Sequence, residues 1–225
     1  MSLTPTTQSE RETRSTTAAK VAVVAAILFG AAMFLTVASV NVPRDATDAE
    51  LLDWWQQESN RMSGVVSGIF AISAAALFAV LMSHVHHLDA TRRSPTWRAF
   101  ARTMAAAFTA AMLVAAATRS TIAHQVDFLD QPLPGVDTLR YATALNYQVL
   151  GLTAMGALAL TILATSVLAL RTGAFTRWAA WVGLGCGAAM LAAVLAGFGI
   201  FTVPLAILWS VCVGIAIRPR LSNAT

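Results

Sequence analysis

Residues 20–40 read KVAVVAAILFGAAMFLTVASV, and the only charged side chain in this stretch is Lys20. A transmembrane helix needs about 20 predominantly apolar residues. In hydrocarbon, backbone N–H and C=O groups find partners only inside a helix or a closed barrel. The stretch lacks the alternation of apolar and polar residues that is typical of a barrel strand. It therefore predicts a transmembrane helix.

Five more stretches share this character in a chain of 225 residues, of which 57% are hydrophobic and 12% charged. A soluble domain carries roughly a quarter charged residues, so the composition indicates a membrane protein. The six predicted spans are residues 20–40, 63–86, 100–122, 143–170, 178–197 and 200–217. The predicted fold class is all-α, a polytopic transmembrane helical bundle over residues 20–217. A disordered tail is expected at residues 1–19 and a second tail at residues 218–225.

The boundary between the last two spans depends on the segment AGFGIFTVP, residues 196–204. Its glycines and proline interrupt an apolar stretch of about 40 residues, which is too long for one span. Two helices joined by a tight turn are predicted over residues 178–217. The alternative is one tilted span followed by an interfacial segment, which would move the C-terminus to the opposite side. Arg218 and Arg220 argue against that alternative.

The charged residues are sorted between the two sides of the predicted bundle. Eleven of the 15 basic residues fall on the side of the termini, and eight of the 11 acidic residues fall on the other side. The positive-inside rule then predicts cytoplasmic termini, in a multi-pass protein of the cell (plasma) membrane. The formal net charge of +4 therefore reflects topology and contact with membrane lipids, and it does not indicate a nucleic-acid partner.

The first outer segment, NVPRDATDAELLDWWQQESNR, carries a helix-start signal. Thr47 followed by Glu50 three residues later makes a capping box, and Leu51 and Trp55 lie one turn apart on the same face. An amphipathic helix is expected near residues 47–60, resting on the outer leaflet with its tryptophans at the level of the headgroups. A pair of aromatic side chains that grips a substrate is the functional alternative.

Two GxxxG patterns, Gly64–Gly68 and Gly183–Gly187, mark places where helices can approach closely. Lipid tails are as apolar as leucine, so helix association in a membrane depends on close backbone packing. The patterns predict tight packing. They leave open whether the packed helix belongs to the same chain or to a second copy.

The segment SHVHHLD, residues 83–89, holds three of the four histidines. His84 and His87 share a helix face and are the only candidate metal ligands, but a zinc or copper site needs further ligands. The remaining histidine, His124, lies a membrane thickness away, which excludes a bis-histidine haem within one protomer. The favoured interpretation is a helix end at which histidines bond the last carbonyl groups. No metal site and no cofactor are predicted.

Polar residues cluster at the outer ends of the third and fourth spans. If these two helices are neighbours, the cluster could line an outward-facing pocket for a polar or anionic headgroup. The alternative is that Arg119 pairs with Asp127 or Asp130 while the amide side chains tie helices together. The members of the predicted pocket are Arg119, His124, Asn146, Tyr147 and Gln148.

No Asp or Glu falls within a predicted span. Proton- and cation-coupled transporters usually place carboxylates near the middle of the membrane, so this absence argues against that class. The only lysine is Lys20, at the edge of the first span, which argues against a retinal Schiff base. Cys186 and Cys212 do not form a C-x-x-C motif, so redox and zinc chemistry have no support.

The segments DAELLDWW, before the second span, and RTGAFTRWAAWVGLG, between the fourth and fifth, resemble a family of uncharacterised small multi-span actinobacterial membrane proteins of about six helices. The second segment carries the family's Arg-Thr-Gly and Arg-Trp patterns at residues 171–173 and 177–178. The chain departs from the family at Thr176, where proline is usual. The resemblance implies the fold and no assigned activity.

The sequence favours a non-enzymatic bundle with a structural or accessory role, or one that binds a lipid or a protein partner. That partner is either another membrane protein or further copies of the chain in a homo-oligomer. The first alternative is a transporter or channel for small molecules or lipids that uses the outward-facing polar pocket. The second is an intramembrane enzyme acting on an apolar substrate through His84, His87 and Asp89. No catalytic residue is predicted.

Overall fold

The computed structural model describes residues 8–40, 42–43 and 46–222, and within these ranges the fold is helical without strands. Four short segments join or continue the α-helices: two 3₁₀ turns, η1 (Asp89–Arg93) and η4 (Gly199–Thr202), and two π-helical segments, η2 (His124–Phe128) and η3 (Val149–Ala154). The α-helices are α1 (Gln8–Ala38), α2 (Asp48–Gln56), α3 (Glu58–His87), α4 (Pro95–Ala123), α5 (Val136–Gln148), α6 (Met155–Thr172), α7 (Arg177–Leu195) and α8 (Val203–Ser222).

The prediction of an all-α bundle with six membrane-spanning helices is confirmed, because six segments of the described chain are long and apolar enough to cross a membrane. Residues 178–217 form two helices, α7 and α8, and the turn between them is tight, as predicted. Gly197 adopts a φ of 84° in this turn, a left-handed conformation that favours glycine. The alternative of one span and an interfacial segment is therefore wrong.

The first helix begins earlier than the sequence predicted. Residues 8–19, expected to belong to a disordered tail, form the opening turns of α1, while residues 1–7 of that tail lie outside the described residues. The tail expected from residue 218 is likewise helical as far as Ser222.

The spans fall into two classes of length. Lys20–Ala38, Arg177–Leu195 and Gly199–Ile217 have 19 residues each, or about 28 Å of helix, which matches a hydrocarbon core of roughly 30 Å. The spans that contain α3, α4 and α5–α6 have 30, 34 and 37 residues, or about 45 to 55 Å. These longer helices therefore exceed the thickness of a hydrocarbon core.

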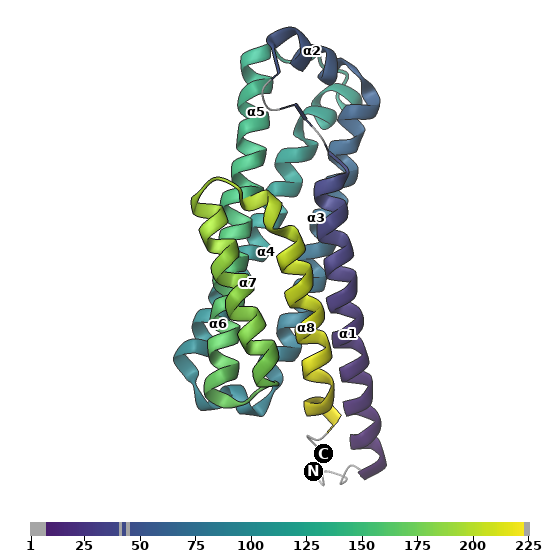
Figure 1. The fold of residues 1–225 in the computed structure, drawn as a ribbon. Coiled ribbons are helices and arrows are strands. Elements are labelled where there is room, and N and C mark those ends of the chain that lie inside the picture. The colour runs from purple at the N-terminus through teal and green to yellow at the C-terminus, as the bar shows by residue number, and fades with distance from the viewer. Residues whose placement is uncertain (1–7, 41, 44–45, 223–225) are drawn as a thin grey trace.

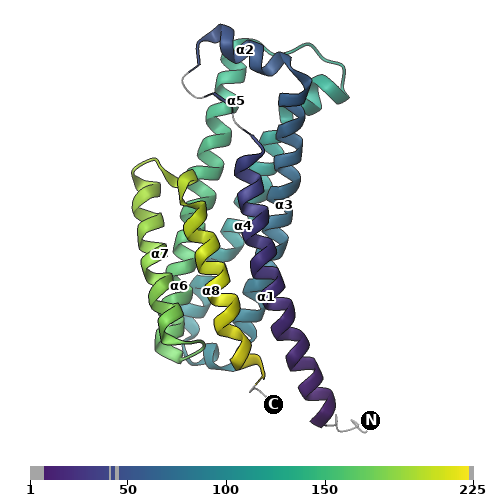
Figure 2. The ribbon, with the colours of Figure 1, turned by 45° about the vertical axis from the view of Figure 1, so that its right-hand side comes forward.

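Figure 1 shows that the extra length lies at one end of the bundle, where α2 crosses over α3 and α5 while the α7–α8 turn lies well below it. We call this the α2 end, and the opposite end, where α1 begins and α8 ends, the terminal end. α1 and α8 lie side by side in both views, and α7 forms the far edge of the bundle (Figures 1 and 2).

The α2 end has a small apolar core of its own, built around α2. The capping box is confirmed: the Glu50 N–H donates to Thr47 Oγ1 at 3.4 Å, and the Thr47 N–H donates to Glu50 Oε2 at 2.8 Å. Leu51 and Trp55 pack with Val42, Ile122 and Leu139. Trp55 is only 6% exposed, so the expectation that both tryptophans anchor in headgroups is wrong for Trp55. Its face of α2 covers the projecting helices instead.

The main core fills the middle of the bundle with aromatic rings from four helices. Phe29, Phe78, Phe108 and Trp209 are fully buried, with ring centroids 4.6 to 6.4 Å apart. No hydrogen-bond partner for the Trp209 indole N–H lies among the described residues. The indole ring packs closely against Gly183 of α7.

Both GxxxG patterns mark close helix contacts within the chain. A Cβ at Gly64 would lie 2.5 Å from the backbone oxygen of Arg119, and one at Gly68 would lie 3.1 Å from that of Ala116, so α3 and α4 touch through backbone. Gly187 packs against the side chain of Leu163, and Gly183 packs against Ser166. These two contacts join α7 to α6. The predicted tight packing is confirmed, and its partner is the same chain.

Candidate functional site at the α2 end

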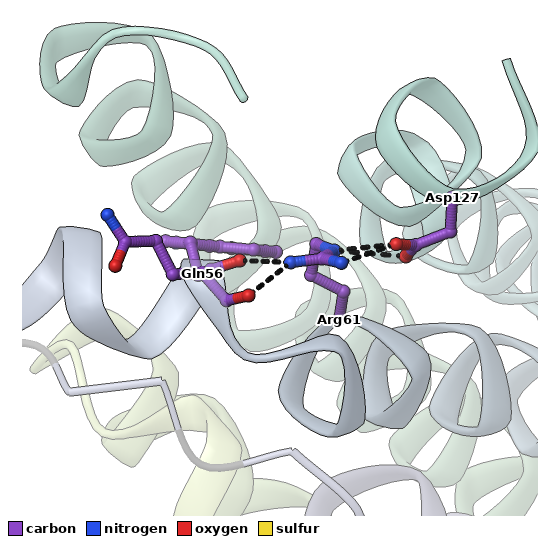
Figure 3. Close-up of polar contacts among 4 residues, drawn as sticks. Gln56, Arg61 and Asp127 are labelled. Carbon is purple, nitrogen blue, oxygen red and sulfur yellow. Dashed lines mark hydrogen bonds and ion pairs between the residues drawn. The ribbon is translucent and has the colours of Figure 1, made fainter. Parts of the chain in front are cut away.

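Arg61, in the first turn of α3, forms the most extensive polar contact at the α2 end. Its Nε donates to both carboxylate oxygens of Asp127 at 2.9 and 3.0 Å, and its Nη2 lies 2.5 Å from Asp127 Oδ1. Its Nη1 donates to the backbone oxygens of Trp55 at 2.8 Å and Gln56 at 2.7 Å. Figure 3 shows the guanidinium between Asp127 and the carbonyl group of Gln56.

The contacts of Arg61 hold neighbouring helices together. Arg61 is 8% exposed, and its planar guanidinium binds the carboxylate through two atoms while it satisfies carbonyl groups that the end of α2 leaves without helical partners. Asp127 lies in the π-helical segment η2, which continues α4 with a wider turn. Arg61 therefore joins α2, α3 and η2 at one point.

Arg119 is the second buried arginine, 4% exposed in α4. Its Nε donates to Asn146 Oδ1 at 2.9 Å, and its Nη1 donates to the backbone oxygen of Thr36 and to Ser67 Oγ. The Ser67 hydroxyl also donates to the Thr36 oxygen, at 2.6 Å. The acceptors are neutral, and no carboxylate among the described residues pairs with Arg119. Arg119 thus ties together α1, α3, α4 and α5.

The alternative prediction for Arg119 is therefore half right. Its pairing with Asp127 or Asp130 is wrong, because Asp127 binds Arg61 and neither acid pairs with Arg119 among the described contacts. The predicted role of an amide in tying helices is confirmed by Asn146. The physical reason for the error lies in the register of α4, which turns Arg119 toward the inside of the bundle and away from the acids that follow it.

The predicted pocket residues lie in three different places. Asn146 contacts Arg119 inside the bundle. His124 is exposed and stacks on Phe128, with the ring centroids 5.8 Å apart. Tyr147 and Gln148 line a pocket to which Arg119, His124 and Asn146 do not contribute.

This pocket, which we call the outer pocket, has a volume of about 320 Å³. It lies where α5 and η3 rise past the α7–α8 turn, with Leu51 of α2 and Pro43 also contributing to its lining. Arg140, Thr143, Tyr147 and Gln148 supply its polar groups, and Leu152, Val194 and Ile200 supply apolar ones. The lining is therefore amphipathic.

Glycines shape the floor of the outer pocket. A Cβ at Gly199 would overlap the backbone oxygen of Gly151, so the α7–α8 turn can press against η3 only with glycine at that position. Gly151 lies in the π-helical segment η3. π-Helical segments are rare and are often found at functional sites, and this one forms part of the pocket wall.

Three of the polar groups of the outer pocket also bond to the protein. The Tyr147 hydroxyl donates to the backbone oxygen of Val42 at 2.9 Å, and the Thr143 hydroxyl donates to that of Leu139 at 2.8 Å. Arg140 forms an ion pair with Asp48 through Nη2, and the side chains of this pair are 48% and 67% exposed. Gln148 is exposed. The Thr143 hydroxyl oxygen is also an acceptor, and the Gln148 amide can donate and accept hydrogen bonds.

The histidines at the terminal end are not brought into a metal centre by the described residues, among which no group of three His, Cys, Asp or Glu side chains lies close enough to hold an ion. The Nδ1 atom of His84 lies 2.8 Å from the backbone oxygen of Val80, which suits the predicted helix end. His87 is exposed on the last turn of α3.

The chain matches no protein-family model, no curated protein and no solved structure. The site must therefore be interpreted from its own geometry. Sequence reasoning missed Arg61 as a buried group and Arg140, Thr143 and Gly151 as pocket residues. One signal was present, since Arg140 and Thr143 precede Tyr147 by seven and four residues and so share its helix face.

Proposed function

We propose that the outer pocket binds an amphiphilic molecule from the outer leaflet, and that the protein is a non-enzymatic lipid- or ligand-binding bundle of the cell membrane. The observation that carries the proposal is the position of an amphipathic pocket at the step between long and short helices. The 19-residue helices α7 and α8 match the thickness of the hydrocarbon core. A pocket at the level of their connecting turn therefore adjoins both the lipid tails and the headgroups.

The chemistry of the lining supports an amphiphile with a polar head. Thr143, Tyr147 and Gln148 all line the pocket from α5 and offer hydrogen-bonding groups. Leu152 and Ile200 provide apolar contacts beside them. Because Arg140 already pairs with Asp48, the rim carries little net charge, and a neutral or zwitterionic head suits it better than a strongly anionic one.

The packing beneath the pocket favours binding over conduction. Leu150, Met155 and Leu158 are fully buried, and the aromatic core of Phe29, Phe78, Phe108 and Trp209 fills the centre of the bundle. A channel or carrier would need an open path at this depth. A binding or accessory role therefore requires no rearrangement of the core.

The test is to fill the pocket and ask whether a bound molecule is lost. Ala144 is exposed and lines the pocket, so Ala144→Phe places a ring in it. Leu145→Phe, on the same helix but outside the lining, is the matched control. Each protein is extracted in a mild detergent and examined by native mass spectrometry.

The proposal predicts that the wild-type protein and Leu145→Phe retain the same outer-leaflet lipid or amphiphile, and that Ala144→Phe loses it at least tenfold. Gln148→Leu should weaken retention without removing it, because one hydrogen-bonding group is lost while the apolar contacts remain. Equal retention by Ala144→Phe and Leu145→Phe would rule out the outer pocket as the binding site.

A further inference from the structure

A second cavity lies at the terminal end, between α3 and α4. We call it the inner groove, and its volume is about 510 Å³. Its apolar walls are made of small side chains, with larger ones at the margins. They include Ala79, Met82, Ala105, Ala106, Ala110 and Leu113. Ala79, Ala106, Ala110 and Leu113 are exposed although they lie within membrane spans, so the groove opens toward lipid.

Basic side chains surround the end of the groove nearest the terminal end. His86 and His87 come from α3, and Arg98 and Arg102 come from α4. Within the described part of the chain, neither arginine forms an ion pair with a carboxylate. Four groups able to carry positive charge thus meet at one end of an apolar groove.

Two of these groups are buried without a partner. His86 is 6% exposed, and neither of its ring nitrogens has a hydrogen-bond partner among the described residues. The Nε atom of Arg98 is likewise buried and without one. A buried donor that makes no hydrogen bond is costly, so the site favours a ligand that brings acceptor oxygens.

The length of the groove matches one leaflet of a bilayer. The rise along α4 from Arg102 to Leu113 is about 16 Å, which is close to half of a hydrocarbon core of roughly 30 Å. A ligand whose acceptor oxygens meet the arginines would therefore have an apolar part that reaches the middle of the membrane.

We propose that the inner groove is a site for a phospholipid with an anionic headgroup, drawn from the leaflet at the terminal end. The phosphate accepts hydrogen bonds from Arg98, Arg102 and His86, and one acyl chain lies along the alanines of α3 and α4. The site is independent of the outer pocket, because it lies at the opposite end of the bundle and shares no residue with it.

The experiment uses the full chain in vesicles that contain phosphatidylglycerol and phosphatidylcholine in equal amounts and with identical acyl chains. After mild extraction, native mass spectrometry counts the lipid molecules that remain bound. The proposal predicts one retained phosphatidylglycerol per chain, with a preference of about tenfold or more, since each arginine near an anionic surface contributes about fivefold. No preference for phosphatidylglycerol would overturn the proposal.

Matched charge variants separate a site from general attraction. Arg98→Gln/Arg102→Gln should abolish the preference, whereas Arg93→Gln/Arg177→Gln, which removes the same charge from exposed positions at the same end, should leave it intact. Equal loss in both double variants would mean diffuse attraction and would overturn the site. His86→Leu should lower retention several-fold, and His84→Leu, whose ring bonds its own helix, should not.

Two further measurements test the acyl chain. Ala110→Phe fills the groove and should prevent retention, while Ala107→Phe, exposed on α4 but outside the groove, should not. Excess inorganic phosphate should not displace the lipid, because the acyl chain supplies much of the binding affinity. Retention by Ala110→Phe, or displacement by phosphate, would contradict a lipid site.

Discussion

The two ends of the bundle use arginine in opposite ways. At the α2 end, Arg61 is surrounded by a carboxylate and two backbone oxygens, and Arg119 by neutral acceptors from three other helices. At the terminal end, Arg98 and Arg102 form no ion pair within the described part of the chain and border a groove that opens to lipid. Arginines that bond to acceptors within the protein hold helices together. Arginines that the protein leaves without a carboxylate partner suit a ligand that brings acceptors.

The difference follows from geometry. The long helices at the α2 end extend past the α7–α8 turn (Figure 1), so α2 can fold over them and bring backbone oxygens to Arg61, which also binds Asp127. At the terminal end, Arg98 and Arg102 lie near the beginning of α4, beside alanine side chains that supply no hydrogen-bond acceptor. The variants below should affect the two ends differently.

The largest effect is expected from Arg61→Ala. Removing one partner of a buried ion pair typically costs about 3 to 5 kcal/mol, and here two carbonyl groups of α2 also lose their donor. Arg98→Gln, at the terminal end, should change stability by less than about 1 kcal/mol. Unfolding of both variants in detergent, followed by circular dichroism, measures the difference. Similar losses in the two proteins would contradict the comparison.

A smaller effect is expected where Arg119 meets neutral acceptors. Arg119→Met and Asn146→Leu should each cost about 2 kcal/mol, since a hydrogen bond to a charged group contributes about 1.5 to 3 kcal/mol. The double variant should cost clearly less than the sum, because both changes remove the same contact. Additive losses in the double-mutant cycle would show that the two side chains do not interact.

Glycine variants distinguish the pocket floor from an ordinary helix surface. Gly199→Ala would overlap the Gly151 oxygen and should cost about 1 to 3 kcal/mol as the turn shifts. Gly185→Ala meets nothing within 4 Å and should stabilise the helix by about 0.5 to 1 kcal/mol. Paired thermal unfolding curves check the opposite signs, and a neutral Gly199→Ala would show that the turn is not tightly packed.

The smallest effect concerns the cap of α2. The hydrogen bonds from the Thr47 N–H and hydroxyl lower the pKa of Glu50 below its ordinary value of 4.5. The stabilisation is therefore complete above that value and is lost as the pH falls through the lower folded pKa. Thr47→Ala should flatten the loss of stability as the pH falls below 4.5. An unchanged acid limb of the stability curve would contradict the role of the cap.

The sequence predicted the features that depend on local patterns. Six apolar stretches, the capping box at Thr47 and Glu50, and the glycine pairs of α3 and α7 all appear as expected. Each is encoded within one or two turns of helix. Composition also indicated a membrane protein before any contact was known.

The candidate site could be predicted only in part, because it depends on contacts between distant residues. Arg61 and Asp127 are 66 positions apart, and their pairing depends on α2 folding over the projecting helices. The π-helical segments η2 and η3 change which face each side chain takes, which a regular helical period cannot reveal. Tyr147 and Gln148 line the outer pocket, whereas Arg119 and Asn146, predicted to lie beside them, contact each other inside the bundle.

The most direct test of the contrast between the two ends is thermal unfolding in nanodiscs of phosphatidylglycerol and of phosphatidylcholine. A ligand that binds only the folded state raises the unfolding temperature by mass action. The wild-type protein and Arg61→Ala should gain the same increase from phosphatidylglycerol, although Arg61→Ala starts lower, and Arg98→Gln/Arg102→Gln should gain none. A full increase in the unfolding temperature of Arg98→Gln/Arg102→Gln would contradict this division of roles between the two ends. So would the absence of that increase in Arg61→Ala.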